Sequence, residues 1–177
     1  MLYLVFQSTG KISSWRQLPP GYAVETWHPG LGRIVPPSLG LKFALWWLLH
    51  WLRLFNNRNY SVLLIRSNGR LVHRTCLIPS YFRWPFMADR DLQVSSTWTH
   101  PEHRCRGLAT YALQMAVSEW VKDGRKLWYV THDDNASSLA VCRSIGFRLL
   151  ARANRTERFG LRIFGRLVLL NKPEAKL

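Results

Sequence analysis

The stretch Trp98–Ala109 reads WTHPEHRCRGLA, and its pattern is that of a strand that passes through a turn into a helix. Such a turn leaves the first N–H groups of the helix without intrahelical partners, at the positive end of the helix dipole. Gly107 has no Cβ, so an anion can approach the backbone there, and Arg104 and Arg106 add positive charge. The segment therefore predicts an anion-binding turn. A simple connection between a strand and a helix is the other interpretation of the same residues.

The residues on either side of this turn predict regular elements. Asp91–Thr99 is expected to be a strand that leads into it. Apolar residues at helical spacing predict a helix over Leu108–Val121, with Gly124 as its C-cap. Further on, we expect a strand over Lys126–Thr131 and a helix over Asn135–Ser144 that ends at Gly146. Two more strands are expected to follow, over Phe147–Ala153 and Leu161–Leu170.

The first half of the chain predicts mainly strands. Ser67-Asn68-Gly69 separates two β-rich runs, and Asn-Gly in this place is typical of a tight β-hairpin. Met1–Phe6 is too short for a signal peptide and lacks its basic residues, so we expect a short buried strand. The other expected elements are strand Gly21–Trp27, helix Leu41–Phe55, hairpin strands Tyr60–Arg66 and Arg70–Ile78, and an irregular segment Pro79–Arg90. This order predicts a mixed α/β sheet in one domain.

The composition limits the class of protein. Of the 177 residues 47% are hydrophobic, which is enough for a core and excludes intrinsic disorder. Three cysteines far apart in the sequence exclude a disulfide scaffold and a Cys-x-x-Cys metal site, and they favour a reducing compartment. The net charge of +15 predicts an anionic partner, such as nucleic acid, an anionic membrane surface or a polyphosphate ligand. A solvated basic surface without a specific partner is the other interpretation. Because no helix-turn-helix or aromatic RNA-binding signature is present, nucleic acid is not expected.

A second motif lies downstream of the anion-binding turn, where Asn135 opens the next expected helix and Gly146-Phe147 follows it. The two motifs, in this order and with this strand pattern, resemble those of the GCN5-related N-acetyltransferase (GNAT) superfamily. The resemblance extends over Asp91–Leu170 and implies a single domain over residues 1–177, with helices flanking a mostly antiparallel central sheet. The matching positions are Arg104, Gly107 and Ala109 in the coenzyme A motif and Asn135, Gly146 and Phe147 in the second motif.

The resemblance implies that acetyl-CoA, or another acyl-CoA, is a cosubstrate and that no metal is needed. The cosubstrate would lie in a V-shaped gap between strands Asp91–Thr99 and Lys126–Thr131. Main-chain N–H groups would hold its pyrophosphate, and an N–H near Trp98 would polarise the thioester carbonyl. Residues 91–170 would then form the acyl-CoA-binding half, residues 1–90 the acceptor-side half and residues 171–177 a tail. The implied binding positions are Trp98, Thr99, Arg104, Cys105, Arg106, Gly107, Leu108, Ala109, Thr110, Asn135 and Ser138.

The acid of the reaction departs from the family pattern. Many members have a tyrosine seven residues after the Asn to protonate the CoA thiolate, and here Cys142 takes that position. Cys142 is either the acid, although a thiol matches a phenol poorly, or a small buried residue. Tyr111, Tyr129 and solvent are the other candidates for the acid.

The base departs from the pattern as well. Family members often have a Glu on a central strand, and this chain has none there, which leaves Asp91, His132 and Asp133 as candidates. His132 follows a strand at the expected gap and titrates in a useful pH range. A structural role for His132 is the alternative.

Three functions fit these features. The first is transfer of an acyl group to the amine of a small molecule, such as an amino sugar linked to a nucleotide or a lipid. Arg74, Arg83 and Arg90 would suit the phosphates of such an acceptor. The second is acetylation of a protein or peptide N-terminus, which usually needs an open acidic or polar groove. The third is an inactive acyl-CoA-binding module, which the missing Tyr and Glu favour.

The segment Leu41–Phe55 reads LKFALWWLLHWLRLF and is the most apolar part of the chain. It is too short to span a membrane, and Lys42, His50 and Arg53 would form a basic stripe along it. A core helix is one interpretation. The other is a helix that contacts a membrane surface, a hydrophobic acceptor substrate or a homodimer partner. We expect a cytoplasmic protein with peripheral membrane contact through this segment.

Overall fold

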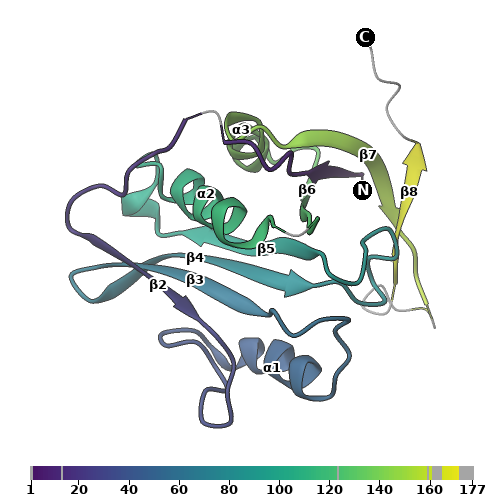
Figure 1. Ribbon diagram of the computed structural model, residues 1–177, viewed down its shortest axis with the longest axis horizontal. Coiled ribbons are helices and arrows are strands. Elements are labelled where there is room, and N and C mark those ends of the chain that lie inside the picture. The colour runs from purple at the N-terminus through teal and green to yellow at the C-terminus, as the bar shows by residue number, and fades with distance from the viewer. Residues whose placement is uncertain (1, 13, 123, 159, 161–164, 172–177) are drawn as a thin grey trace.

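The chain forms one eight-stranded sheet with helices on both faces (Figure 1). The computed structural model describes residues 2–12, 14–122, 124–158, 160 and 165–171. The strands lie in the order β2-β3-β4-β5-β6-β1-β7-β8, and β5 and β6 are parallel while the other neighbours are antiparallel. The mixed, mostly antiparallel sheet predicted from the sequence is confirmed. The strands are β1 Tyr3–Gln7, β2 Tyr22–Trp27, β3 Ser61–Ser67, β4 Arg70–Pro79, β5 Leu92–Thr99, β6 Leu127–His132, β7 Arg148–Arg155 and β8 Leu167–Asn171.

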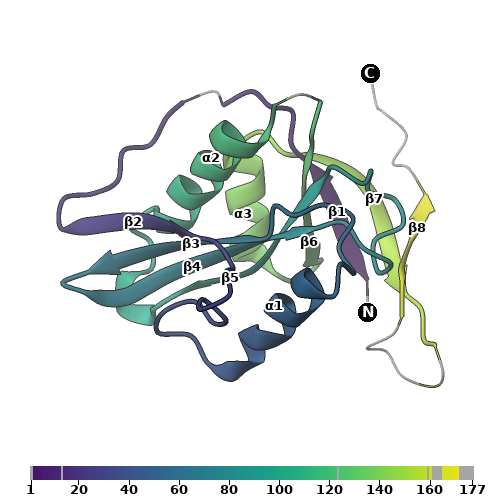
Figure 2. The same cartoon turned by 60° about the horizontal axis from the view of Figure 1, so that its bottom comes forward.

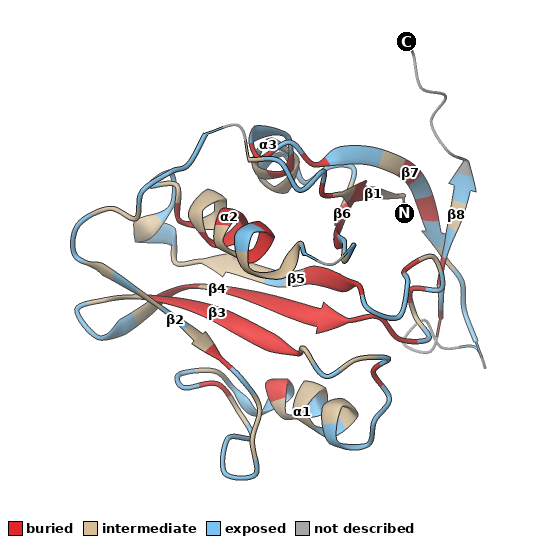
Figure 3. Ribbon diagram, viewed as in Figure 1, coloured by how far each residue is buried: buried red, intermediate tan, exposed pale blue. Residues whose placement is uncertain are grey.

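The helices divide the core into two layers (Figure 2). Helices α2 (Leu108–Trp120) and α3 (Ala136–Ser144) cover one face, where Leu108, Leu113 and Val94 are buried together. Helix α1 (Ala44–Trp51) lies on the other face, over an aromatic core. Burial by residue follows these layers (Figure 3). The aromatic core is built on Trp27, Phe43, Phe55, Tyr60, Tyr81, Trp84 and Trp128.

Strand β1 is inserted between β6 and β7, far from β2 in the sheet. Tyr3 is in register with His132 on one side and with Ala153 on the other. Val5 and Phe6 are buried, so the short N-terminal strand expected from the sequence does form, over Tyr3–Gln7. The first strand therefore lies within the part of the sheet that belongs to residues 91–170.

Local turn chemistry explains the β3–β4 hairpin. Ser67 pairs with Arg70, and Asn68 and Gly69 between them both have positive φ values, 48° and 75°. Asn and Gly are the residues that adopt this backbone most readily, so the hairpin forms where the sequence predicts it.

Several element boundaries differ from those expected. The predicted helix Leu41–Phe55 is a 3₁₀ turn, Leu41–Phe43, followed by α1, which ends at Trp51 because Arg53 has a left-handed φ of 57°. Arg53 therefore does not continue a helical stripe with Lys42 and His50. Helix α2 ends at Trp120 with Val121 as its C-cap, and Gly124 lies in the turn beyond it. Residues 161–164 of the last predicted strand lie outside the described residues, and β8 extends to Asn171.

No helix in the described part of the chain has the length and apolar character needed to cross a bilayer.

Candidate functional site

Strands β5 and β6 separate at one end, which opens the sheet. Their paired register extends from Leu92 and Leu127 to Val94 and Tyr129, and no pairing is found beyond it in these two strands, both described in full. At the same level Ser96 has a positive φ of 49°, and the register of β4 with β5 shifts between Arg74 and Cys76. This bulge bends the end of β5, as bulges do beside functional sites.

A cavity of about 650 Å³ lies at this separation. Its lining comes from the end of β5, the turn after it, the first turns of α2, Tyr129 of β6 and the start of α3. A cavity between the carboxyl ends of adjacent parallel strands is a common place for a ligand in α/β proteins. The lining includes most of the binding positions predicted from the sequence: Trp98, Thr99, Arg104, Cys105, Gly107, Leu108, Ala109, Thr110, Asn135 and Ser138.

The turn before α2 has the backbone of an anion site. Cys105 and Gly107 both have left-handed φ values, 59° and 78°, and Gly107 is the N-cap of α2. The N–H of Tyr111 donates to the carbonyl of Gly107 (2.9 Å), and no side chain in the described residues caps the helix. The N–H groups of the first helical turn are therefore left for a ligand in the cavity, at the positive end of the helix dipole.

Two of the predicted arginines lie differently around this turn. Arg104 lines the cavity, and its Nε donates to the carbonyl of Thr99 (3.3 Å). Arg106 is not part of the lining, and its Nη1 donates to the hydroxyl of Tyr22 (3.1 Å), which also bonds His103 Nδ1 (2.9 Å). Arg106 thus contributes charge near the turn, and its guanidinium points toward β2.

A third arginine was missed by the sequence analysis. Arg16, on the segment between β1 and β2, lines the cavity. Its guanidinium lies so close to Gly107 that a Cβ on Gly107 would overlap it. The N–H of Arg16 donates to Gln114 Oε1 (3.0 Å), and Gln114 Nε2 donates to the carbonyl of Ser14. Gln114 is a buried residue of α2. A polar residue at a core position of a helix needs a hydrogen-bond partner, and this is the feature of the sequence that points to the contact with Arg16.

Tyr129, Ser138 and Asn135 form a hydrogen-bonded chain at the cavity wall. The Tyr129 hydroxyl donates to Ser138 Oγ (3.2 Å). Asn135 is the N-cap of α3, and its Oδ1 accepts from the N–H of Ser138 (3.1 Å) and from Ser137 Oγ (2.9 Å). Burial raises the pKa of Tyr129 above its usual value, an effect that hydrogen bonds to Ser138 and Thr97 partly offset. The phenol is therefore protonated at neutral pH and faces the cavity.

The other acid candidates lie away from the cavity. Cys142 is a fully buried residue of α3 and is not part of the lining, and burial raises the pKa of its thiol to about 12. Tyr111 is not part of the lining either, and its ring contacts the edge of Trp15. Of the candidate acids named from the sequence, the structure brings Tyr129 alone to the cavity wall.

The three base candidates also lie outside the lining. Asp91 is buried at the start of β5 and accepts hydrogen bonds from Trp128 Nε1 (2.8 Å), Lys126 N (3.0 Å) and Ala88 N (3.1 Å). This carboxylate joins β5, β6 and the loop before β5 at the opposite end of the strand. The ring of His132 packs against Tyr3 (centroids 4.3 Å apart), and Asp133 is exposed in the turn after β6.

A buried histidine supports the cavity floor. His73 on β4 is fully buried; its Nδ1 bonds Thr99 Oγ1 (2.8 Å) and its Nε2 bonds Thr75 Oγ1 (3.0 Å). Burial, and then the neighbouring Arg74, lowers its pKa to about 4, so the imidazole is neutral. Thr75 and Thr99 both line the cavity, and His73 fixes their hydroxyls. His73 belongs to no motif in the sequence, because its partner Thr99 lies on the next strand.

Three side chains beside the turn carry atoms that bind divalent cations. The ligand atoms of His100, Glu102 and His103 all lie within 4.8 Å of one another. Two features oppose a cation there. The Nδ1 of His103 is already bonded to Tyr22, and Arg104 and Arg106 follow directly in the sequence. We therefore assign no metal to the cluster.

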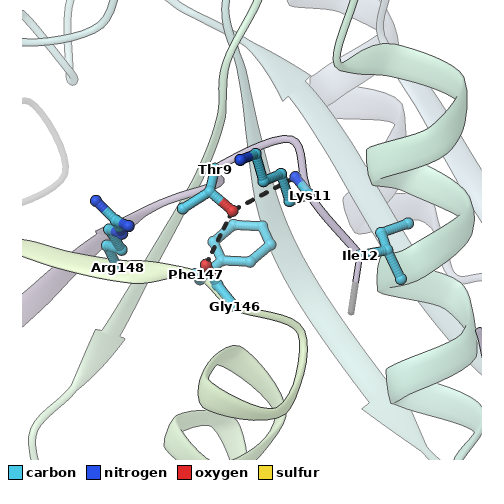
Figure 4. A pocket seen from close by; sticks show the side chains of 6 residues that line it. All are labelled: Thr9, Lys11, Ile12, Gly146, Phe147 and Arg148. Carbon is cyan, nitrogen blue, oxygen red and sulfur yellow. Dashed lines mark hydrogen bonds between the residues drawn. The ribbon is translucent and has the colours of Figure 1, made fainter. Parts of the chain in front are cut away.

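A second hollow lies on another side of the molecule, between the segment after β1 and the start of β7 (Figure 4). Thr9 Oγ1 donates to the carbonyl of Gly146 (3.3 Å) and accepts from the N–H of Lys11 (3.4 Å). This open hollow shares no lining residue with the cavity, and it has no helix N-terminus or buried acid. It is therefore an internal control for ligand binding. Its lining residues are Thr9, Lys11, Ile12, Gly146, Phe147 and Arg148.

Solved structures with the same fold are similar to this chain. A protein from Novosphingobium aromaticivorans that is assigned to the GNAT family has a TM-score of 0.55 and 19% identity, and the match covers 85% of this chain and 60% of that one. A Drosophila protein has a TM-score of 0.58 and 14% identity, over 85% and 48%. A tandem GNAT protein from the clavulanic acid biosynthesis pathway has a TM-score of 0.53 and 15% identity, over 84% and 50%. This chain thus spans about half to three-fifths of their lengths, and they support the fold alone.

The family is shown by the sequence itself. The model of the acetyltransferase (GNAT) family matches residues 23–147, which include β3 to β6, all of β2 but its first residue, and the turn before α2. No curated protein matches the chain. The matched residues contain the separated strands, the anion-binding turn and the N-cap of α3 described above. The chain therefore belongs to the GNAT family of acetyltransferases.

Proposed function

We propose that this protein transfers an acetyl group, or another short acyl group, from acyl-CoA to the amine of a small molecule. The observation that carries the proposal is the cavity between β5 and β6, which has the uncapped N-terminus of α2 at one end and a protonated tyrosine in its wall. The helix N-terminus suits the pyrophosphate of acyl-CoA, and the phenol suits the thioester at the end of the pantetheine arm.

The cavity would hold acyl-CoA along its length. N–H groups of residues 105–110 bind the pyrophosphate, and Arg104 and Arg16 add charge from two sides. The end of β5 that has no strand partner in β6 lies along the pantetheine arm. This arrangement brings the thioester between Trp98 and Tyr129, where a backbone N–H of β5 polarises its carbonyl.

The chemistry then needs one protein acid. The neutral amine attacks the thioester carbonyl carbon, a C–N bond forms, the C–S bond breaks, and the amine loses its proton to solvent. Tyr129 gives its phenolic proton to the departing CoA sulfur and regains one from water. Asn135 holds Ser138, and Ser138 accepts the hydrogen bond that orients the phenol.

The acceptor enters from the side of the sheet that α1 covers. Trp98 lines the cavity, and the guanidinium of Arg74 lies between its ring (5.0 Å) and that of Phe43 (5.3 Å). An arginine held by two rings is a preformed site for a phosphate, which favours a phosphorylated or nucleotide-linked amino sugar. Arg83 packs on Tyr81, and Arg90 lies before the start of β5, beside Gly124, so the three arginines named from the sequence do not form one site.

The amide of Asn135 provides a test of the acid's positioning. Asn135→Ala is expected to lower kcat about tenfold, equivalent to about 1.4 kcal/mol, because Ser138 and the Tyr129 phenol lose their fixed positions. The lost cap alone costs about 1 kcal/mol of stability. Asn135→Ser retains a capping side chain and should stay close to wild type in both properties. The measurement is kcat per folded molecule, alongside thermal melting. If the melting temperature falls while kcat per folded molecule stays intact, Asn135 is a helix cap with no part in the reaction.

The function itself is tested by thiol release from acetyl-CoA in the presence of amines. The panel contains glucosamine, glucosamine 6-phosphate, a nucleotide-linked amino sugar and a peptide with a free N-terminus, with mass spectrometry of the products. We expect release with the phosphorylated amino sugars, and Arg74→Gln should raise their KM more than that of glucosamine. Release with the peptide alone would make the protein an N-terminal acetyltransferase. Tight acetyl-CoA binding without release in any mixture would make it a binding module.

A further inference from the structure

Helix α1 presents an apolar surface to solvent. Leu45 and Leu48 lie on one side of the helix and are 50% and 44% exposed, and Leu41 before it is 83% exposed. None of the helix residues is fully buried, and Figure 3 shows α1 in the colours of intermediate and exposed residues. We call this surface the α1 face and define it by Leu41, Leu45, Leu48, Trp51, Leu52 and Leu54.

The α1 face is held in place from behind. Phe43 and Phe55 at its two ends are buried in the aromatic core, and Trp46 stacks on Phe55 (ring centroids 6.4 Å apart). Trp47 Nε1 donates to the carbonyl of Gly30 (3.1 Å) and so fixes the neighbouring loop, where Leu31 is 82% exposed. One side of the helix is therefore anchored, and the apolar residues on its other side remain outside. Exposed apolar patches rimmed by polar residues mark interaction sites.

The charge around the α1 face is mainly positive. Residues 26–88 contain no Asp or Glu at all. Four basic residues in the segment that carries the helix are exposed: Arg33, Lys42, Arg53 and Arg58. The surface is thus apolar at its centre and mainly basic around it, with the exposed Asp89 at one end, where its Oδ1 accepts from Asn56 Nδ2 (2.8 Å). An apolar surface with mainly basic surroundings suits an anionic bilayer.

We propose that the α1 face docks this protein on the surface of an anionic membrane. The leucines and Trp51 enter the headgroup region, and the four basic side chains contact lipid phosphates. A helix of eight residues is about 12 Å long and therefore lies along the interface. A second copy of the chain is a poorer partner, because two-fold pairing through this face would bring the same basic side chains together, and residues 26–88 contain no acid to pair with them. The docking surface is independent of the acyl transfer.

Co-sedimentation of the full chain with vesicles tests the proposal. Vesicles of phosphatidylcholine are compared with vesicles that also contain phosphatidylserine, at low and at high salt. We expect binding to the anionic vesicles that weakens with salt. Leu45→Glu/Leu48→Glu should lower the partition coefficient by about tenfold or more, since it removes apolar contacts and adds two negative charges.

A matched control separates the α1 face from general charge. Leu149→Glu/Leu170→Glu changes the net charge equally, at two leucines that are 42% and 45% exposed on β7 and β8, and it should lower binding much less. Three results would overturn the proposal. The first is no binding of the wild type to anionic vesicles at low salt. The second is an equal loss of vesicle binding in the two double variants. The third is unchanged vesicle binding in Leu45→Glu/Leu48→Glu, when the wild type is a dimer and this variant is a monomer. The last would make the α1 face a homodimer interface.

Discussion

Gly107→Glu is expected to raise the Kd for acetyl-CoA about a hundredfold or more, which corresponds to a loss of about 2.7 kcal/mol of binding free energy. Gly107 has a φ of 78°, and the space beside it already holds the Arg16 guanidinium. A glutamate there puts a carboxylate among the N–H groups that bind the pyrophosphate, where it competes with the ligand and repels it. Isothermal titration calorimetry with acetyl-CoA measures the effect.

Two further variants control for the fold. Gly32→Glu makes the same change at an exposed glycine with open space around it, and its Kd should match that of wild type. Gly107→Asn introduces a residue that tolerates a positive φ and carries no charge, so it should bind acetyl-CoA more tightly than Gly107→Glu. Equal affinity in wild type and in a folded Gly107→Glu would contradict the site.

Tyr129→Phe should lower kcat by two to three orders of magnitude, about the contribution of one general acid, and leave the KM for acetyl-CoA within about twofold. The change removes a single hydroxyl, and the ring keeps its place in the core. Because burial raises the pKa of Tyr129, the acid is present at neutral pH, and its contribution disappears only as the pH rises through that raised pKa. Steady-state kinetics of thiol release over a range of pH measures both parameters.

Cys142→Ala and Tyr111→Phe are the matched controls for this acid. Cys142 is buried outside the cavity lining, so Cys142→Ala should retain most of the activity. Tyr111→Phe removes the same hydroxyl from a tyrosine that does not line the cavity, and it should behave like wild type. A loss of three orders of magnitude in folded Cys142→Ala, with full activity in Tyr129→Phe, would make the thiol the acid.

The parts of the fold that depend on residues close together in the sequence could be predicted from it. Asn68-Gly69 specifies the hairpin, since these residues accept the left-handed backbone that a two-residue turn needs. The binding turn was predictable for a similar reason, because a glycine just before an apolar helix has no side chain to cap the first N–H groups of that helix. The structure adds the second left-handed residue, Cys105, which no pattern pointed to.

Contacts between residues far apart in the sequence could not be predicted from local patterns. The position of β1 between β6 and β7 depends on pairing with residues more than a hundred positions away, and the Met1–Phe6 pattern predicts only a strand. Asp91 was named as a base because a carboxylate near the expected gap suits that role, but its bonds to Trp128, Lys126 and Ala88 hold the far end of β5. Arg16 reaches the cavity from a segment without a motif, through its contact with Gln114.

Hydrogen exchange at backbone amides, with and without saturating acetyl-CoA, tests the central claim most directly. It reports whether acyl-CoA binds to the N–H groups after β5. We predict slower exchange in peptides that cover residues 97–99 and 105–110 when acetyl-CoA is present, and no change in peptides that cover residues 9–12 and 146–148 around the second hollow. Slower exchange confined to the second hollow, or no change in residues 105–110 at saturation, would contradict the account.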